Sequence, residues 1–158
     1  MTDKTDKIHT LEELVEDARF AMITTVATDG SLESRPMTIQ EYANGVFRFI
    51  TKRDTHVAQQ GDGTKVNLAI VESNSWISVS GEGRVLNNEP LLERLWGLGN
   101  DMFADGGPDD PDNVVFEVRP DSASYWDTPG AIGTVLGLVK AKFTDGDPDV
   151  GEQQNVEL

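Results

Sequence analysis

Arg35 is the first side chain whose type and setting indicate binding chemistry. It lies in Ser34-Arg35-Pro36-Met37, within a run that is typical of a β-strand. Proline cannot donate to a strand ladder, so Pro36 predicts an edge strand or a bulge, and a local distortion there would expose Arg35. A guanidinium offers a planar fork of donors that suits a phosphate or the carbonyl-rich edge of a heteroaromatic ring. Taken alone, however, the motif is explained more simply by a surface arginine on an edge strand.

A second group of polar side chains surrounds an expected helix start at residues 51–56. It contains two cations, two threonine hydroxyls and a histidine: Lys52, Arg53, Thr51, Thr55 and His56. Free backbone N–H groups and the positive end of the helix dipole favour an anion at such a start. A solvated loop with a threonine cap is the alternative, and spacing alone does not exclude it. The group is therefore a candidate phosphate site with a second interpretation open.

Trp126, in Ser124-Tyr125-Trp126-Asp127, is a third candidate, because an indole at a strand end can flank a planar ligand. A buried core tryptophan is the simpler interpretation of this residue on its own. The chain has no cysteine, and its two histidines, His9 and His56, lie in unrelated contexts without metal-ligand spacing. We therefore expect no metal site, and no residue can be named as catalytic. Dinucleotide, Walker and nucleophile-elbow motifs are also missing, so redox chemistry would need a bound cofactor.

Length and charge restrict the class of protein. The chain has 158 residues, 37% of them hydrophobic, which suits one domain with a single core. No apolar run approaches the roughly 18 residues of a membrane-spanning helix, and the polar amino terminus lacks the features of a secretory signal. The net charge of -15 repels phosphate backbones. We expect a soluble, cytoplasmic protein that binds neither membranes nor nucleic acids, with its acidic runs as solvated surface.

The elements that would position these residues are mostly strands. The capping-box pattern from Thr10 to Glu13 predicts a helix start, and Asp29-Gly30 predicts a hairpin. Further turn and strand signals complete the first half as a three-stranded meander followed by a short helix. The expected strands are 20–27, 32–42 and 46–50, and the helix is 55–60.

The second half continues with strands and two more helices. We expect strands at 65–71 and 76–86, a helix at 88–98, a loop at 104–112 and a closing helix at 135–141. Gly81 and Gly83 mark a bend or bulge in the second of these strands. Residues 113–119 and 123–126 form either a strand pair or one broken strand, and the polar tail after them is expected to be loose. The pattern predicts a mostly β protein with helices, of the α+β class, forming a small antiparallel barrel.

The order of these motifs resembles the pyridoxamine 5'-phosphate oxidase-like flavoproteins, and within them the bacterial general stress proteins. The resemblance rests on these segments: 24–26 with Asp29-Gly30, 34–37, 49–51, 76–85, 106–111, 125–127 and 137–152. It implies an antiparallel FMN-binding split barrel of Greek-key type. It divides the chain into a polar lead at 1–9, a flavin-binding domain at 10–142 and an acidic tail at 143–158.

The resemblance also implies a cofactor, a partner and a site. FMN is expected first, with FAD as the alternative, in a cleft between the two subunits of a homodimer. The implied cofactor-binding residues are Arg35, Pro36, Met37, Thr38, Ile50, Thr51, Lys52, Thr55, His56 and Trp126, and the contacting strand extends to Gln40.

The chain departs from the oxidase pattern at three places. His56-Val57 replaces an Arg-Lys pair that contacts the FMN phosphate, so one fixed cation is lost and the other depends on pH. Trp76 replaces a glutamine near the flavin. The segment 127–131 replaces the Arg-x-His that holds the vitamin B6 phosphate. We therefore expect a flavin-binding general stress protein rather than a true pyridoxamine phosphate oxidase.

Three functions remain open at this point. The first is an FMN-dependent oxidoreductase that acts on an unknown small substrate. The second is a stress protein that binds or senses flavin without turnover, which the lack of an obvious acid, base or nucleophile favours. The third is a structural dimer that has lost its cofactor, which the change at His56-Val57 favours.

Overall fold

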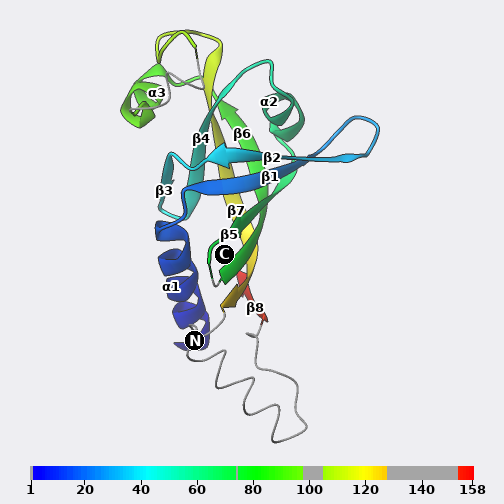
Figure 1. Ribbon diagram of the computed structural model, residues 1–158, viewed down its shortest axis with the longest axis vertical. Coiled ribbons are helices and arrows are strands. Elements are labelled where there is room, and N and C mark those ends of the chain that lie inside the picture. The colour runs from blue at the N-terminus through cyan, green and yellow to red at the C-terminus, as the bar shows by residue number, and fades with distance from the viewer. Residues whose placement is uncertain (1, 74, 98–104, 128–152) are drawn as a thin grey trace, which may run out of the picture.

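One curled antiparallel sheet forms the body of the protein (Figure 1). The computed structural model describes residues 2–73, 75–97, 105–127 and 153–158. In these residues the strands are β1 (Phe20–Val26), β2 (Leu32–Thr38), β3 (Glu41–Ala43), β4 (Val46–Lys52), β5 (Lys65–Val71), β6 (Ser75–Leu86), β7 (Asn113–Asp127) and β8 (Gln153–Glu157). The helices are α1 (Thr2–Glu16), α2 (His56–Gly61) and α3 (Glu89–Leu95). The predicted mostly β, split-barrel fold is confirmed.

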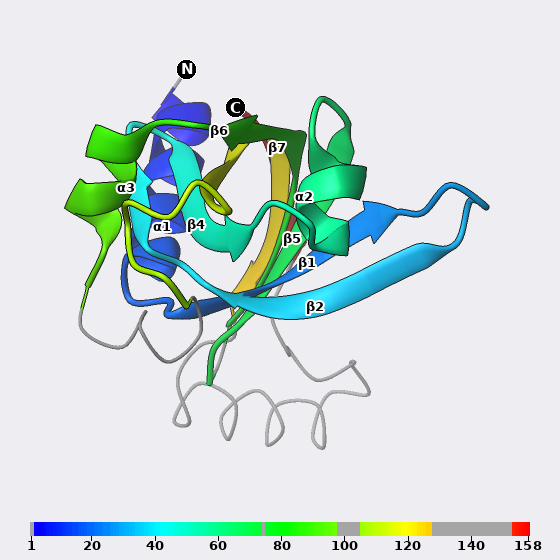
Figure 2. The ribbon, with the colours of Figure 1, turned by 90° about the horizontal axis from the view of Figure 1, so that it is seen from above.

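The strand order is β2-β1-β5-β6-β7-β4-β3, and β8 pairs with β7. The expected meander is wrong, because β4 pairs with β3 and β7 instead of β2. The expected strand 32–42 ends at Thr38, and the next two residues leave the ladder. The Ile39 amide donates to the carbonyl of Arg19, and the Gln40 amide donates to that of Arg48. This link crosses from one end of the sheet to the other and draws the two ends together (Figure 2).

Alternating burial along the strands builds the core. In β1 the side chains of Ala21, Ile23 and Thr25 point inward, while those between them are more exposed. Phe47 and Phe49 of β4 and Phe116 of β7 are fully buried in the same cluster. Burial of an aromatic side chain contributes about 2 kcal/mol or more, so these rings are major sources of stability.

Helix α1 covers one end of this core and begins earlier than expected. The sequence placed a cap at Thr10, but the helix already begins at Thr2. The Thr10 hydroxyl donates to the carbonyl of Asp6, four residues back, and so lies within the helix instead of capping it. Leu11 and Val15 of α1 belong to the main core cluster.

The carboxyl-terminal part of the chain adds two features to the sheet. Residues 113–127 form the single long strand β7, whose register with β6 shifts between Ser80 and Gly81, as the glycines predicted. The tail is not wholly loose, because Gln153–Glu157 pairs with β7 and buries Val156. The pairing gives hydrogen-bond partners to the backbone groups of β7 on the side away from β6, and Val156 adds an apolar contact with the core. The expected helix at 135–141 lies outside the described residues.

Helix α3 follows β6 and begins where the sequence indicates. The side chain of Asn88 caps it by accepting from the Leu91 amide, and Pro90 lies in its first turn. It ends at Leu95, three residues earlier than expected. Within the described part of the chain, no helix has the length and apolar character needed to cross a membrane.

Candidate functional site

A cavity of about 430 Å³ is lined by residues of the edge strand β2, of β4 and of the start of α2. The prediction that Pro36 marks an edge strand or a bulge is confirmed as an edge strand, because among the described strands β2 pairs with β1 alone. The cavity is lined by Phe20, Arg35, Pro36, Met37, Thr38, Gln40, Ile50, Thr51, Thr55, His56 and Val57. Its volume falls within the roughly 300–1,000 Å³ that is usual for small-molecule sites.

The structure brings together all but two of the residues that the sequence proposed. Residues 35–38 come from β2, Ile50 and Thr51 from β4, and Thr55 and His56 from the start of α2. Residues more than ten positions apart in the chain therefore share one cavity. The two exceptions are Lys52 and Trp126, which do not line it.

Lys52 points toward the loop before β7. Its ammonium lies 3.6 Å from a carboxylate oxygen of Asp110 and donates to the carbonyl of Asp105. Ile50 and Lys52 lie on the same face of β4, but Lys52 is the last residue of the strand and its side chain bonds to the loop before β7. Within the described residues, Arg35 and His56 are the basic side chains of the cavity lining.

The charged and apolar residues occupy different parts of the cavity. On β2, Arg35 pairs with Ile23 of β1, whereas Thr38 pairs with Phe20. Three residues along a strand correspond to about 10 Å, so the guanidinium end and the phenyl end are well separated. The site is therefore amphipathic along its length, with cations near α2 and an aromatic ring at the start of β1.

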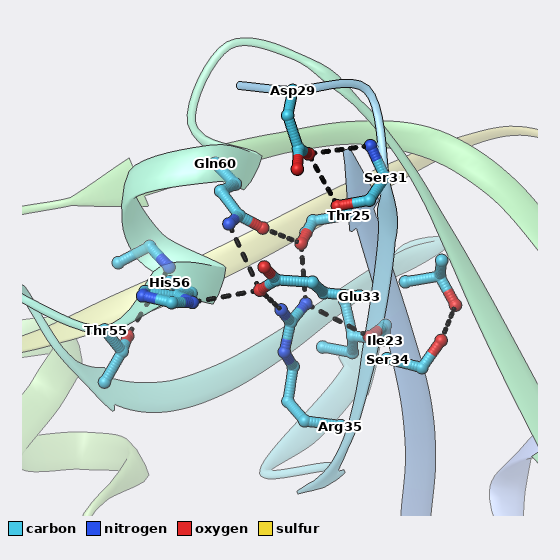
Figure 3. A network of polar contacts seen from close by, with 12 residues as sticks. Ile23, Thr25, Asp29, Ser31, Glu33, Ser34, Arg35, Thr55, His56 and Gln60 are labelled. Carbon is cyan, nitrogen blue, oxygen red and sulfur yellow. Dashed lines mark hydrogen bonds and ion pairs between the residues drawn. The ribbon is translucent and has the colours of Figure 1, made fainter. Parts of the chain in front are cut away.

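Four side chains form a closed ring of hydrogen bonds at the cationic end, named here the Glu33 ring (Figure 3). Its members are Thr25, Glu33, Arg35 and Gln60, and His56 is attached to the ring through Glu33. One carboxylate oxygen of Glu33 lies 3.2 Å from Arg35 Nη2, 2.9 Å from His56 Nδ1 and 3.2 Å from Gln60 Nε2. Arg35 Nη1 donates to the Thr25 hydroxyl at 2.7 Å, and that hydroxyl donates to Gln60 Oε1 at 2.6 Å.

This ring fixes the orientation of Arg35. Nη1 also donates to the carbonyl of Ile23 at 3.3 Å, so both of its hydrogens have acceptors within the chain. Nη2 donates one hydrogen to Glu33, and no acceptor in the described residues contacts the second Nη2 hydrogen or Nε–H, so both can bond to a ligand. The hydrogen bond from His56, followed by that from Gln60, lowers the pKa of the Glu33 carboxyl.

The threonine hydroxyls at the start of α2 have a local role. The Thr55 hydroxyl donates to the carbonyl of Lys52 at 2.7 Å and accepts from the Ala58 amide at 3.5 Å. Its hydrogen is therefore used, so Thr51 is the donor in their contact at 3.0 Å. Thr55, one of the two residues that the sequence offered as a cap, with Asp54 as the other, caps the helix, while Val57 is buried and His56 is exposed.

Sequence reasoning missed Phe20, Glu33 and Gln60 at this site. Phe20 is an exposed aromatic side chain at the first position of a strand, which is a signal the sequence could have offered. Glu33 precedes Arg35 by two residues, so both must lie on one face of β2. Nothing in the local pattern pointed to Gln60, whose position depends on how α2 packs against β1.

Trp126 lies on the outer surface of the sheet, next to its β6 partner Trp76. Trp76 also pairs with Val71 of β5, on the side of β6 away from Trp126. Extending the register of β1 with β5 places Phe20 beside Val71, so these four side chains form one row across the sheet. Phe20, Val71 and Trp76 are 59%, 66% and 43% exposed. This outer apolar row therefore crosses the sheet and reaches the cavity at Phe20.

Comparisons with known proteins agree with this fold. The family model described as pyridoxamine 5'-phosphate oxidase like matches residues 6–149. The chain therefore belongs to the pyridoxamine 5'-phosphate oxidase-like family, as the order of its motifs suggested.

Solved relatives include members of the general stress protein 26 family. A protein assigned as general stress protein 26 from Jannaschia sp. CCS1 is 25% identical and superposes with a TM-score of 0.81, covering 98% of this chain and 99% of the other. The general stress FMN/FAD binding protein from Xanthomonas citri is also 25% identical, with a TM-score of 0.66 and coverage of 77% and 89%. The Neurospora crassa protein bli-3 is 26% identical over 153 residues, which span 87% of this chain and 73% of that protein.

Proposed function

We propose that this protein binds a flavin mononucleotide in the cavity between β2, β4 and α2. The observation that supports this most directly is the amphipathic lining, with Arg35 and His56 at one end and Phe20 at the other. A flavin has a large planar ring system and a chain that ends in an anion, so it complements both ends. The Xanthomonas citri relative, whose name records FMN/FAD binding, supports the same ligand class. FAD remains the alternative.

The chain would contribute binding and orientation, and the flavin would supply electron and hydride transfer. Arg35 would donate its free Nε–H and Nη2 hydrogens to ligand oxygens, and the Glu33 ring would hold the guanidinium in place. Met37, Ile50 and Pro36 would exclude water from the ring system. On this basis we propose an oxidoreductase of a small substrate.

We also propose that two copies of the chain associate through the outer face of the sheet. The outer apolar row leaves Phe20, Val71 and Trp76 exposed, and Phe20 belongs to the cavity lining as well. A second copy on this face would cover these side chains and close the cavity from outside. Trp126 lies on the same face and away from its own cavity, so it would serve the cofactor of the partner subunit.

Flavin binding without turnover is a second candidate function. The Glu33 ring favours it, because its acid and base groups are already one another's partners. Anaerobic titration with NADH or NADPH separates the two candidates. Steady bleaching of bound flavin supports the oxidoreductase, whereas a spectrum that never changes supports binding alone.

The binding proposal itself is tested by the absorbance spectrum of freshly purified protein and by titration with FMN, FAD and riboflavin. We expect the spectrum of an oxidised flavin, or quenching of flavin fluorescence on titration. A colourless protein that ignores all three ligands would refute flavin binding and favour a dimer that has lost its cofactor.

A further inference from the structure

Resting on flavin binding as proposed above, we propose that Glu33 competes with the phosphate of the ligand for Arg35 and His56. Glu33 would thereby reduce the selectivity of the site for phosphorylated flavins. In this role Glu33 is a positioning residue that controls which flavin the cavity prefers. The inference concerns this chain's own side chains and assigns them a role that the family membership does not.

The first step is the charge of the cationic end. Arg35 and His56 are the basic side chains of the cavity lining within the described residues, and both contact the same Glu33 oxygen. Glu33 itself is not part of the lining and lies behind these two groups. The positive charge of Arg35 is offset by the negative charge of Glu33. A phosphate that enters this end therefore meets a guanidinium that already has a carboxylate beside it.

The second step is the placement of the phosphate. The anionic end of the ligand must lie near Arg35 and His56, because the other end of the cavity is formed by Phe20 and Thr38. A phosphate bonded to the free hydrogens of Arg35 would then stand within a few ångströms of Glu33. Two like charges at such a separation repel, and because solvent screens these exposed groups we expect an effect of roughly tenfold in affinity.

The third step is the rigidity of the competitor. Glu33 accepts hydrogen bonds from Gln60 and Arg35 and is bonded to His56, so it cannot turn away without breaking several contacts. Both outer members of the ring, Thr25 and Gln60, are themselves bonded to each other. The carboxylate therefore stays beside the cations whether the ligand carries a phosphate or not.

The test compares FMN with riboflavin, which differ only in the phosphate. Dissociation constants for both are measured by fluorescence quenching in the wild type, Glu33→Gln and Glu33→Ser. The control is Glu13→Gln, which removes the same charge from a His–Glu pair on α1, where His9 Nδ1 lies 3.4 Å from Glu13. Thermal melting confirms that each variant is folded.

We expect the wild type to prefer FMN over riboflavin by less than about tenfold, and Glu33→Gln and Glu33→Ser to raise that preference by about tenfold. Glu13→Gln should leave the ratio unchanged. A general loosening of the site would shift both affinities together and leave the ratio where it was. An unchanged or reduced ratio in both Glu33 variants overturns the inference while flavin binding stands. Failure of the wild type to bind either ligand would refute flavin binding, and the inference with it.

Discussion

Gly83 of β6 lies so close to Gly61, the last residue of α2, that a Cβ on Gly83 would stand 2.4 Å from the Gly61 carbonyl oxygen. The same Cβ would stand 2.7 Å from Cζ of Phe116, and a Cβ on Gly61 would stand 2.5 Å from that atom. The two glycines thus let α2 pack directly over the Phe116 ring. This contact holds the helix that provides His56 and Gln60 to the site.

We therefore expect Gly83→Ala to destabilise the protein by about 3 kcal/mol, because backbone and a buried ring must both move. Chemical denaturation measures the free energy of unfolding. Gly97→Ala is the matched control, since a Cβ there meets no atom within 4 Å. Equal stability of the two variants would show that the close approach of Gly61 and Gly83 is unimportant.

Arg35→Ala should weaken flavin binding by about 10- to 100-fold, because a charge-assisted hydrogen bond contributes about 1.5–3 kcal/mol. The sequence alone made Lys52 an equal candidate for this role. Since the Lys52 ammonium is bound by Asp110 and Asp105, we expect Lys52→Ala to leave the affinity within about twofold. Titration of both variants with FMN decides between them, and an unaffected Arg35→Ala variant would remove the proposed site.

Acid should destabilise the contact between α3 and the sheet through Glu41. Hydrogen bonds from Arg94 of α3, and then from Arg48, lower the pKa of Glu41 from 4.5 to about 2. Because the folded-state pKa is depressed, the stabilisation is complete above pH 4.5 and is lost as the pH falls toward 2. Because solvent screens these ion pairs, we expect the loss of stability to be about 1–2 kcal/mol.

Urea denaturation of the wild type and of Glu41→Gln between pH 7 and pH 2 tests this role. The variant should be less stable at neutral pH, and the difference should shrink as the acid protonates Glu41 in the wild type. A difference that stays constant across this range would show that the ion pairs of Glu41 with Arg94 and Arg48 contribute nothing.

Trp76→Glu should dissociate the proposed dimer, because it places a charge in the middle of the outer apolar row. Analytical ultracentrifugation gives the mass of the wild type and the variant. Gln59→Glu adds the same charge to the exposed side of α2 and should leave the dimer intact. A wild type that sediments as a monomer at micromolar concentration would contradict this interface.

The sequence by itself determined the mostly β class, the hairpin at Asp29-Gly30 and a helix start near Thr55, and it indicated an edge or a bulge at Pro36. These depend on backbone preferences and hydrogen bonding within a few residues, which local residue types report directly. It also selected most of the side chains that line the cavity, through the order of motifs along the whole chain.

Only the tertiary structure decided which of these side chains meet. Three sets of contacts join segments far apart in the chain: the pairing of β4 with β7 in place of β2, the pairing of β8 with β7, and the Glu33 ring. Such contacts follow from sheet closure and from the close packing of α2 on Phe116, which no local pattern encodes. The tertiary structure also bonds Lys52 to the loop before β7 and leaves Arg35 in the cavity lining.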